Sequence, residues 1–592
     1  MCGIIGYVGK NDAIKNLKNG LKKLEYRGYD SAGIAFFDDK ELKIIKSVGK
    51  VENLFSKFKF KNSNIGIGHT RWATNGKADI KNCHPHQSEG KKVCLVHNGI
   101  IENAETLKTK FLTNIKFKSQ TDTEVICNLI EYFLSKNNDK IYAIQSATKL
   151  LRGSYSLAIL FGDEPEKIYF AKNKSPLLIG IGQKQNFIAS DILGFANKTN
   201  KYIVLKDNQI GWISKSAIAI FEKNSQIEPK FQVFDKTINE TTKGNFQHYM
   251  LKEINQIPEC LNEISRIYSK ECSPFFKIDK DYLKNIEKIC LVACGTSFHA
   301  CLCGEKYFRK LGFDAFSEIA SEFVYSPPKL TKNTLYIFVS QSGETADTIS
   351  AIKTVKQKSV KTIAITNVET SQIAKLCDYN LPIFSGPEIA VASTKAYNCQ
   401  IAVLLLFANF LKQNDIIYLA QSIQKAAKHI DIKSFTRQIM PIVNIISNSK
   451  NVFICGKNFD YITALESALK IKEITYINCQ GIASGEFKHG TIALVDENTT
   501  IFALLTEKNL YKKTINIVNQ TKARGAKIVA ITNCKNDNFS KFDYVIKTPK
   551  TKEILSPLVS IVPMQLLAYF TAIKLGYNPD KPRNLAKSVT VE

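Results

Sequence analysis

Hydrophobic and polar residues follow different patterns in the first and second parts of the chain. Up to about residue 225, short apolar runs rich in β-branched and aromatic residues alternate with turns, which predicts antiparallel strands. The predicted strands are 3–8, 33–37, 65–68, 93–96, 155–161, 187–189 and 202–205. Helical periodicity is limited to 12–24, 124–134 and 141–150. We therefore expect an α+β domain of stacked antiparallel sheets over residues 2–225.

The later pattern predicts a repeated α/β fold. Residues 226–247 are polar without a sustained period and suit a linker. Beyond them, each apolar strand is followed by a helical segment, which is typical of doubly wound sheets. Ile289-Cys-Leu-Val-Ala-Cys-Gly is echoed by Val452-Phe-Ile-Cys-Gly, and Lys361-Thr-Ile-Ala-Ile-Thr-Asn by Lys527-Ile-Val-Ala-Ile-Thr-Asn. We predict duplicated domains at 248–435 and 436–575 and a tail at 576–592; chance similarity of two parallel sheets is the alternative.

Composition narrows the class of protein. With 592 residues, of which 44% are hydrophobic, the chain suits roughly three to five domains. The apolar run 401–407 falls far short of the ~20 residues of a bilayer span, and residues 1–10 lack a basic leader. The fifteen Cys show no disulfide framework. We expect no membrane segment, reduced thiols and a cytoplasmic location.

The charge of the chain is strongly positive, with 81 Lys+Arg against 54 Asp+Glu and a net +27. Only eight of these cations are Arg, and the Lys residues are spread evenly. Recognition of nucleic-acid phosphates and bases favours clustered Arg. The excess therefore does not predict a nucleic-acid partner.

Cys2 is a candidate nucleophile. Removal of Met1 would leave a thiol and an α-amine on one residue. An α-amine with a pKa of about 7.7–8 can accept the proton of a thiol with a pKa of about 8.5. The alternative is a buried small residue that opens a strand.

Two loops add groups suited to amide hydrolysis. Residues 66–76 end one predicted strand in a polar loop, and residues 96–103 end another in a tight turn. Asn98 and the amide of Gly99 are candidate oxyanion donors. Arg71 and Asp122 are candidates to hold the carboxylate and amine of an amino acid.

Five motifs in this part carry a family resemblance. They are Cys2-Gly-Ile, Leu24-Glu-Tyr-Arg-Gly-Tyr-Asp-Ser-Ala-Gly33, His69-Thr-Arg-Trp-Ala-Thr, His97-Asn-Gly-Ile-Ile-Glu-Asn and Thr121-Asp-Thr-Glu. Together they resemble the N-terminal-nucleophile glutaminase of class II amidotransferases. The resemblance implies glutamine hydrolysis through a γ-glutamyl thioester on Cys2, with Asn98 and Gly99 as the oxyanion hole. It also implies glutamine binding by Arg71, Trp72, Thr74 and Asp122, and places Arg27 inside a functional motif.

A zinc site is the rival interpretation of this region. Cys83 and His86, like Cys94 and His97, have a spacing compatible with zinc ligands. Because Cys94 lies in an apolar strand, a core thiol is the expected outcome. We expect no metal.

Hydroxyl-rich segments follow the predicted strands of the second part. They are Gly295-Thr296-Ser297, Ser340-Gln341-Ser342 with Thr345, and Val391-Ala-Ser393. Ligands of open α/β sheets bind beyond the carboxyl ends of strands, where helix amides favour a phosphate. Without a Gly-Lys-Ser/Thr Walker pattern, a compact sugar phosphate is favoured over a nucleotide triphosphate. The alternative for any one segment is a helix N-cap.

These segments resemble the sugar isomerase domain. Together with the glutaminase and the ending Pro582-Arg-Asn-Leu-Ala-Lys-Ser-Val-Thr-Val-Glu592, they make essentially the whole chain resemble the isomerizing glutamine:fructose-6-phosphate aminotransferase family. This implies conversion of glutamine and fructose 6-phosphate to glutamate and glucosamine 6-phosphate, the first step of hexosamine biosynthesis. It also implies a homodimer without a cofactor.

The resemblance also assigns roles at the sugar site. Glu473 matches the proton-transfer carboxylate, and Lys470 at i−3 shares its helical face; a solvated surface pair is the alternative. His489 matches the residue that opens the sugar ring from the neighbouring subunit. Lys587 matches a lysine that contacts the open sugar or forms an imine with it, and Arg583 is expected to pair with a carboxylate or the substrate.

Asn75, Asn478 and Gln480 depart from the family pattern, and residues 248–258 lack the usual Glu-Gln before Pro258. None removes a proposed catalytic group. Two other functions stay open: a sugar-phosphate-binding regulator with a vestigial glutaminase, and a related aminotransferase or deglycase that acts on another sugar phosphate.

Overall fold

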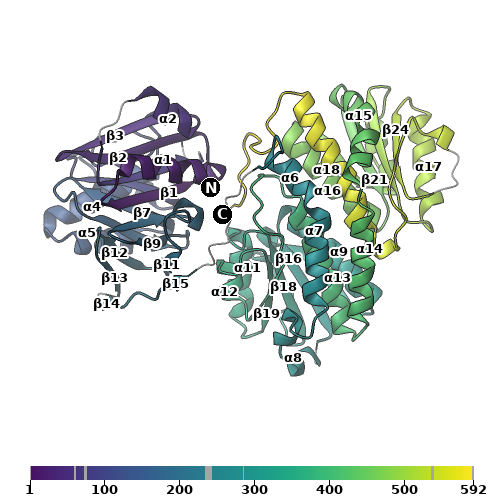
Figure 1. The fold of residues 1–592 in the computed structure, drawn as a ribbon, viewed down its shortest axis with the longest axis horizontal. Helices are drawn as coiled ribbons and strands as arrows, with labels where there is room; N and C mark the ends of the chain where they lie inside the picture. The colour runs from purple at the N-terminus through teal and green to yellow at the C-terminus, as the bar shows by residue number, and fades with distance from the viewer. Residues whose placement is uncertain are drawn as a thin grey trace. The chain divides into compact units, whose positions relative to one another are not determined.

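The computed structural model describes residues 2–58, 62–72, 76–223, 225–233, 243–284, 286–534 and 539–589. The chain forms two compact units that divide near residue 241. Figure 1 draws the first unit in purple and blue and the second in teal to yellow. Much of the predicted linker, residues 234–242, lies outside the described residues.

Two antiparallel sheets form the centre of the first unit. Their strand orders are β15-β11-β9-β10-β1-β4-β2-β3 and β14-β13-β12-β8-β7-β6-β5. The strands are β1 (Gly3–Gly9), β2 (Ser31–Asp38), β3 (Glu41–Val48), β4 (Ile65–Arg71), β5 (His86–Gln87), β6 (Val93–Ile101), β7 (Gly153–Phe161), β8 (Ile168–Asn173), β9 (Leu178–Gly182), β10 (Gln185–Ala189), β11 (Lys201–Val204), β12 (Gln209–Ile213), β13 (Ile218–Glu222), β14 (Ser225–Ile227) and β15 (Gln232–Val233).

The two sheets stack face to face and carry helices on their outer faces. Along β1, Ile4 packs between the sheets and Ile5 packs on the outer face, as the period of two in a strand requires. The helices are α1 (Ala13–Leu24), α2 (Val51–Lys57), α3 (Ala104–Phe111), α4 (Asp122–Lys136) and α5 (Lys140–Leu150). Asp12 caps α1 by accepting the Ile14 N–H at 3.0 Å, and Leu17 packs beneath the first sheet. The predicted stacked antiparallel fold is confirmed.

The tight turn predicted within residues 96–103 begins later than expected, at residues 102–103. Strand β6 continues through Ile101 and pairs with β7 to its end. Gly99 has a φ of 137°, and a Cβ there would lie 2.0 Å from the Ser154 carbonyl oxygen. Only glycine fits this irregular strand, so a strand here reads as a turn in the sequence.

The second unit contains two parallel sheets of the same topology. Their orders, β17-β16-β18-β19-β20 and β22-β21-β23-β24-β25, are both 2-1-3-4-5 in chain order. The strands are β16 (Lys288–Ala293), β17 (Asp314–Ile319), β18 (Thr334–Ser340), β19 (Thr362–Thr366), β20 (Tyr379–Pro382), β21 (Asn451–Gly456), β22 (Cys479–Ala483), β23 (Thr499–Leu505), β24 (Lys527–Thr532) and β25 (Tyr544–Lys547). The predicted duplication is therefore present in the fold.

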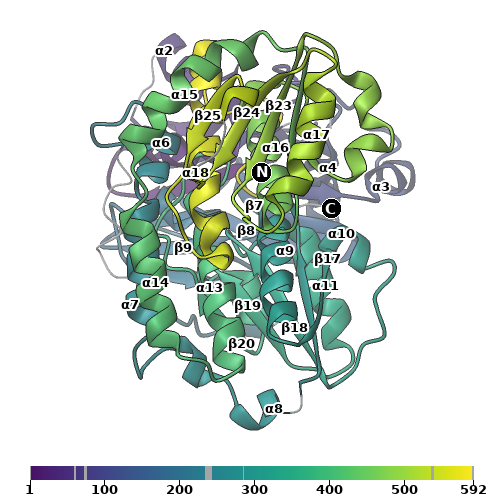
Figure 2. The same ribbon diagram turned by 90° about the vertical axis from the view of Figure 1, so that its right-hand side faces the viewer.

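Helices join the two repeats into one unit (Figure 2). They are α6 (Tyr249–Asn255), α7 (Ile257–Tyr268), α8 (Lys280–Lys284), α9 (Gly295–Lys310), α10 (Ala320–Phe323), α11 (Ala346–Lys356), α12 (Gln372–Leu376), α13 (Lys395–Leu411), α14 (Ile416–Lys428), α15 (Ile432–Ser447), α16 (Phe459–Thr475), α17 (Tyr511–Lys522) and α18 (Ser556–Lys574). One hydrophobic core includes Leu291 of the first sheet and Ile454 of the second. Because this core is continuous, α9 of the first repeat contacts α16 of the second.

Helix α18 is apolar on nearly all sides. The segment Glu553–Lys574 is long and apolar enough to cross a membrane by length and composition, but 89% of its most apolar window is buried inside the unit. A helix that is hydrophobic all round is expected at the centre of a large core. The longest apolar segment is therefore this helix, which the consecutive apolar run 401–407 did not reveal.

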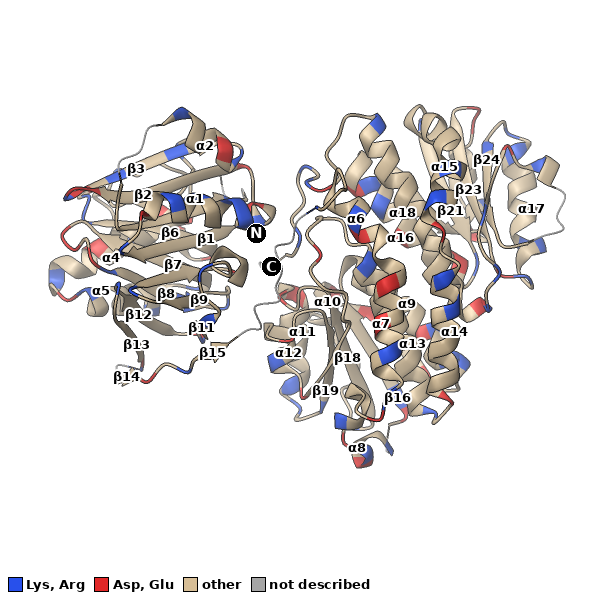
Figure 3. Cartoon of the chain, in the orientation of Figure 1, with Lys and Arg blue, Asp and Glu red and all other residues tan. Residues whose placement is uncertain are grey.

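The state of the cysteines and the distribution of the charges can both be compared with the sequence-based expectations. All fifteen Cys are free thiols, as predicted. Figure 3 shows Lys and Arg interspersed with Asp and Glu over helices and loops of both units.

Candidate active sites

The first candidate site lies where β1 begins and β4 ends. Cys2 directly precedes β1, and its Sγ accepts the Trp72 backbone N–H at 3.2 Å. This contact follows from the antiparallel pairing that sets Gly3 opposite Thr70. Burial raises the pKa of the Cys2 thiol, against the opposing effect of the Trp72 N–H bond. A nearby base is therefore needed to generate the thiolate.

The backbone of Cys2 is held from the second sheet. Its carbonyl oxygen accepts Asn98 Nδ2 at 2.9 Å and Arg27 Nε at 3.4 Å. Arg27 is fixed in turn by an ion pair with Asp191 at 3.0 Å. Asn98 and Gly99 on β6 thus lie beside the candidate nucleophile.

Three of the other predicted glutamine-binding residues, Arg71, Trp72 and Asp122, lie within the described part of the chain. Arg71 is 3% exposed and donates to the carbonyls of Gly76 and Lys77, both at 3.3 Å. Asp122 begins α4 and accepts the Ile101 N–H at 2.7 Å. The Trp72 ring meets the Tyr29 ring edge-on. Thr74, like Asn75, lies outside the described residues.

The residues of the rival zinc interpretation have other partners. Cys83 Sγ donates to the Asp79 carbonyl at 3.0 Å, and Cys94 is fully buried in the sheet core. His86 and His97 lie within hydrogen-bond distance of the Thr121 and Thr123 hydroxyls. Within the described ranges, no three His, Cys, Asp or Glu side chains are grouped to hold a metal ion.

The second candidate site contains a row of buried charges on α16. Lys470 Nζ lies 2.6 Å from Glu473 and 3.3 Å from Glu466. The side chains of Lys470 and Glu466 are fully buried, and that of Glu473 is 19% exposed. The i−3 spacing places Lys470 and Glu473 in contact, as predicted. The pair lies in the interior, so the alternative of a solvated surface pair is wrong.

This row reaches across to the first repeat. Thr296, in the first turn of α9, lies 3.0 Å from Lys470 Nζ and 3.1 Å from Glu466 Oε1. His299, one turn further along α9, contacts the other oxygen of Glu466 at 2.7 Å. Glu466 was missed from the sequence, although its position at i−4 from Lys470 places it on the same face.

The electrostatics of Glu473 suit a base. Burial raises the pKa of this carboxyl, against the opposing charges of Lys470 and Lys587. A carboxylate with a raised pKa is a stronger base toward a carbon-bound proton.

Lys587 is anchored near the same place by a further buried carboxylate. Its Nζ lies 2.5 Å from Glu388, which also accepts the Ser393 hydroxyl at 2.7 Å. Burial alone would raise the pKa of Glu388, but Lys587 and backbone N–H groups lower it. The tail is held because Asp580 accepts the first two N–H groups of α6 at 2.9 and 2.8 Å.

Two of the three hydroxyl-rich segments, at the start of α9 and after β18, lie at the switch point of the first repeat. Ser340 ends β18, and its Oγ is 3.0 Å from the Thr345 hydroxyl, just before α11. Ser342 Oγ accepts the Glu344 N–H at 3.2 Å. Since β16 and β18 are neighbours whose connections diverge, this segment and the start of α9 share one edge of the sheet.

The remaining predicted residues of this region have structural partners. Ser297 Oγ accepts Gln400 Nε2 at 2.9 Å, and Gly295 begins α9 with a φ of 56°. The Gln341 carbonyl accepts the Asn367 N–H at 3.2 Å, and the Val391 N–H donates to the Asp580 carbonyl at 3.1 Å.

The equivalent position in the second repeat is occupied by its own carboxylate. Glu507, which follows β23, accepts the Phe459 N–H at 2.7 Å and Asn458 Nδ2 at 2.9 Å. The N-terminus of α16 is therefore already neutralised, whereas the first repeat presents hydroxyl groups there.

Asp460, in the first turn of α16, should make stability depend on pH. Burial raises its pKa to about 7, so the folded chain holds a proton that the unfolded chain releases near 3.9. Stability is thus greatest below pH 4 for this group and is lost as pH rises to about 7. Between pH 4 and 7, the unfolding free energy of Asp460→Asn should fall less than that of wild type, by up to about 4 kcal/mol. The thermal midpoint of the variant should therefore also fall less over this pH range. Parallel slopes in thermal scans would contradict this assignment.

Two predicted residues lie apart from these contacts. His489 is exposed, and only its backbone N–H is bonded, to the Glu486 carbonyl at 2.9 Å, among the contacts described for this region. The Arg583 guanidinium stacks 4.1 Å from the centre of the Tyr476 ring. Asn478 and Gln480 are both exposed.

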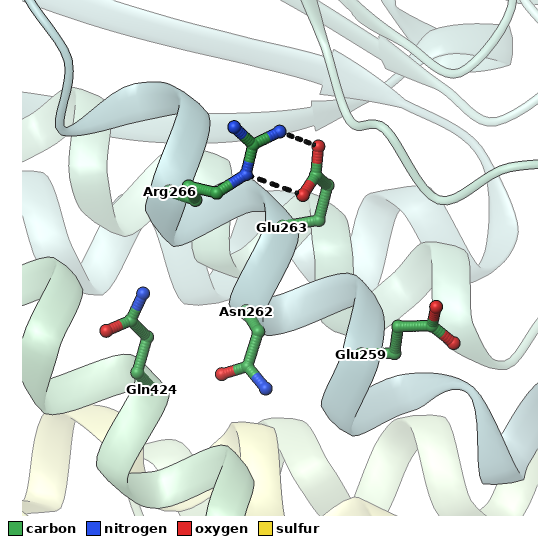
Figure 4. A pocket seen from close by; sticks show the side chains of 5 residues that line it. All are labelled: Glu259, Asn262, Glu263, Arg266 and Gln424. Atoms are coloured by element: carbon green, nitrogen blue, oxygen red, sulfur yellow. Dashed lines mark hydrogen bonds and ion pairs between the residues drawn. The ribbon is translucent and has the colours of Figure 1, made fainter.

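A groove between α7 and α14 carries none of the predicted site residues. Figure 4 shows its lining of Glu259, Asn262, Glu263, Arg266 and Gln424. Arg266 pairs with both carboxylate oxygens of Glu263, at 2.9 and 2.5 Å. The pair satisfies both charges within one helix.

Known proteins share both the motifs and the fold. The SIS domain family matches residues 282–410 and 445–575, and the glutamine amidotransferase domain family matches residues 69–197. Glutamine–fructose-6-phosphate aminotransferases [isomerizing] of Clostridium tetani and Shouchella clausii are each 40% identical, over all of this chain and all of theirs. The C-terminal domain of glucosamine-fructose-6-phosphate aminotransferase from Francisella tularensis superimposes with a TM-score of 0.55 and 31% identity, over 57% of this chain and 99% of that one.

The two full-length relatives and the domain matches agree with the geometry at both sites. A thiol at the start of a glutaminase sheet and a buried acid–lysine row beside a hydroxyl-rich loop occur in one chain. The chain belongs to the isomerizing glutamine–fructose-6-phosphate aminotransferase family.

Proposed function

We propose that this enzyme transfers the amide nitrogen of glutamine to fructose 6-phosphate and isomerises the product to glucosamine 6-phosphate, with release of glutamate. The observation that carries this proposal is the row Glu466–Lys470–Glu473, buried beside Thr296 at the start of α9. A base held in this way next to a phosphate-type loop suits proton transfer on a sugar phosphate. Cys2 in the same chain releases the nitrogen, as ammonia, from the amide of glutamine.

In the glutaminase half, Cys2 acts as an N-terminal residue after removal of Met1. The α-amine takes the thiol proton, and Sγ attacks the amide carbon of glutamine. Asn98 Nδ2 and the Gly99 N–H stabilise the oxyanion, and the protonated amine returns the proton to the leaving ammonia. Water then hydrolyses the thioester to glutamate. Arg71, Trp72, Thr74 and Asp122 bind the substrate or close over it.

In the sugar half, His489 opens the ring and ammonia adds to the C2 carbonyl with loss of water. Glu473 then takes a proton from C1 and, after exchange with solvent, delivers a proton to C2, so that the imine becomes an amine and C1 becomes an aldehyde. Lys470 holds Glu473 in place, and Lys587 contacts the open sugar or forms a transient imine with it.

Phosphate recognition is assigned to the first repeat, by Gly295, Thr296, Ser297, Ser340, Gln341, Ser342, Thr345, Val391 and Ser393. Hydroxyl and amide donors at a helix start suit a phosphate dianion. We also propose a cytoplasmic homodimer, because exposed His489 would act in the partner's site. The ammonia passes between the two reactions without mixing with bulk solvent.

The alternatives differ in what they predict for one assay. Purified protein with glutamine and fructose 6-phosphate should form glutamate and glucosamine 6-phosphate in equal amounts. A regulator would form neither, and an enzyme for another sugar would form glutamate without this amino sugar. Either outcome would overturn the proposal.

Replacement of Ser342 by Ala should weaken sugar binding. Loss of one hydroxyl bond to a charged phosphate costs about 1.5–3 kcal/mol, so the KM for fructose 6-phosphate should rise at least about tenfold. Hydrolysis of glutamine alone should be unaffected. Ser422→Ala on α14 is the matched control in steady-state kinetics, and equal KM values in the two variants would exclude this loop.

A further inference from the structure

Four buried histidines lie behind the first candidate site, and none has a role in the proposed reaction. His69 on β4 is 1% exposed and is the one beside Asn98. Its Nε2 lies 3.0 Å from the His97 carbonyl oxygen and 3.1 Å from Asn98 Oδ1. A single ring nitrogen therefore faces two oxygens.

The contacts fix the tautomer of His69. A carbonyl oxygen only accepts, so Nε2 must carry the hydrogen and donate. The other nitrogen, Nδ1, is buried and has no hydrogen-bond partner among the residues that the structure describes. Burial also lowers the pKa of His69 to about 3, which keeps the ring neutral with one hydrogen.

The same reasoning fixes the side-chain amide of Asn98. Its Nδ2 donates to the Cys2 carbonyl oxygen at 2.9 Å, while its Oδ1 faces His69 Nε2. A flipped amide would set an oxygen against the Cys2 carbonyl and an NH₂ group against the His69 N–H. Both contacts would then be repulsive.

His69 is itself held rigidly. Its ring stacks on that of His84, with centroids 4.1 Å apart and planes at 16°. His84 Nδ1 accepts the His97 N–H at 3.3 Å, and its Nε2 lies 3.3 Å from the Thr123 hydroxyl. The His69 ring therefore packs on a neighbour that is itself hydrogen-bonded in place.

We propose that His69 is a positioning residue whose Nε2–H locks the Asn98 amide with its NH₂ group directed toward Cys2. The inference rests on the proposed glutaminase reaction, in which this NH₂ group stabilises the oxyanion. Because the Asn98 NH₂ group acts in the transition state, loss of its contact with His69 should lower kcat for glutamine hydrolysis and leave glutamine binding unchanged.

The test compares His69→Leu with His69→Gln in the full chain, because the Gln amide nitrogen can occupy the place of Nε2. In His69→Leu, kcat for glutamine hydrolysis should fall roughly 10- to 100-fold with KM within about threefold. His69→Gln should restore most of the rate. Asn98→Ala should add little to His69→Leu, because both remove the same donor. Alkylation of Cys2 by iodoacetamide and ammonia-dependent synthesis should stay near wild type in both.

Several results would overturn the inference. They are an unchanged kcat in His69→Leu, a loss confined to KM, no recovery in His69→Gln, or full additivity with Asn98→Ala. If His69→Leu does not fold, His69→Asn replaces it, since its shorter amide does not reach Asn98. His429→Leu, at an exposed histidine, is the matched control. If wild type itself does not hydrolyse glutamine, the proposed function has failed and not this inference.

Discussion

Replacement of Cys2 by Ala should abolish glutamine-dependent synthesis of glucosamine 6-phosphate and leave ammonia-dependent synthesis intact. Loss of a covalent nucleophile typically lowers kcat by more than about 1000-fold. The sugar site is built from other residues, on α9 and α16, so the variant should use added ammonium at more than about half the rate at which the wild type uses added ammonium. Parallel assays with glutamine and with ammonium chloride measure both rates.

Cys272 offers a matched control for this experiment, since it is an exposed thiol on the second unit. Cys272→Ala should retain both activities. Glutamine-dependent synthesis that survives in Cys2→Ala would show that another group is the nucleophile. Loss of both activities would show that Cys2 supports the fold and would leave its chemical role without support.

Replacement of Glu473 by Gln should impair synthesis of the amino sugar and leave the hydrolysis of glutamine intact. The change keeps the shape of the side chain but removes the base, so synthesis should fall about 10²- to 10⁴-fold with either nitrogen donor. Lys470 retains Glu466 as an ionic partner at 3.3 Å, so no unpaired buried charge is created. Hydrolysis of glutamine should continue at the wild-type rate.

A solvent-exchange measurement makes the Glu473 test specific. In heavy water, wild type should incorporate deuterium at C2 of the amino sugar, and Glu473→Gln should incorporate it at a correspondingly reduced rate. Glu263→Gln, on the surface of α7, is the matched control. Synthesis within threefold of wild type in Glu473→Gln would assign the proton transfer to another residue.

The local patterns of the sequence predicted most elements that combine an apolar face with clear ends. The strand 3–8 corresponds to β1, a continuous apolar run buried on both faces, and the helix 12–24 corresponds to α1, which buries one regular face. Strand β3 was not predicted, since its side chains are mostly half-buried and polar residues interrupt it. Strand β6 extends past Gly99 because pairing with β7 outweighs the local preference of glycine for turns.

At the sites, contacts between residues close in the sequence could be predicted, whereas contacts between distant residues could not. Lys470 and Glu473 are three residues apart on one helix, so their contact follows from helical geometry. Lys587 and Glu388 are 199 residues apart and meet only because the tail is fixed by Asp580 at α6. The contact of His69 with Asn98 depends on the stacking of two sheets, which no spacing in the sequence expresses.

The most direct test of the proposed function follows the nitrogen atom itself. Wild-type protein would receive glutamine labelled with ¹⁵N in the amide, fructose 6-phosphate and excess unlabelled ammonium, and the amino sugar would be analysed by mass spectrometry. Transfer from glutamine predicts glucosamine 6-phosphate that carries mostly ¹⁵N, with one glutamate for each amino sugar. Unlabelled amino sugar, or glutamate without amino sugar, would contradict the account.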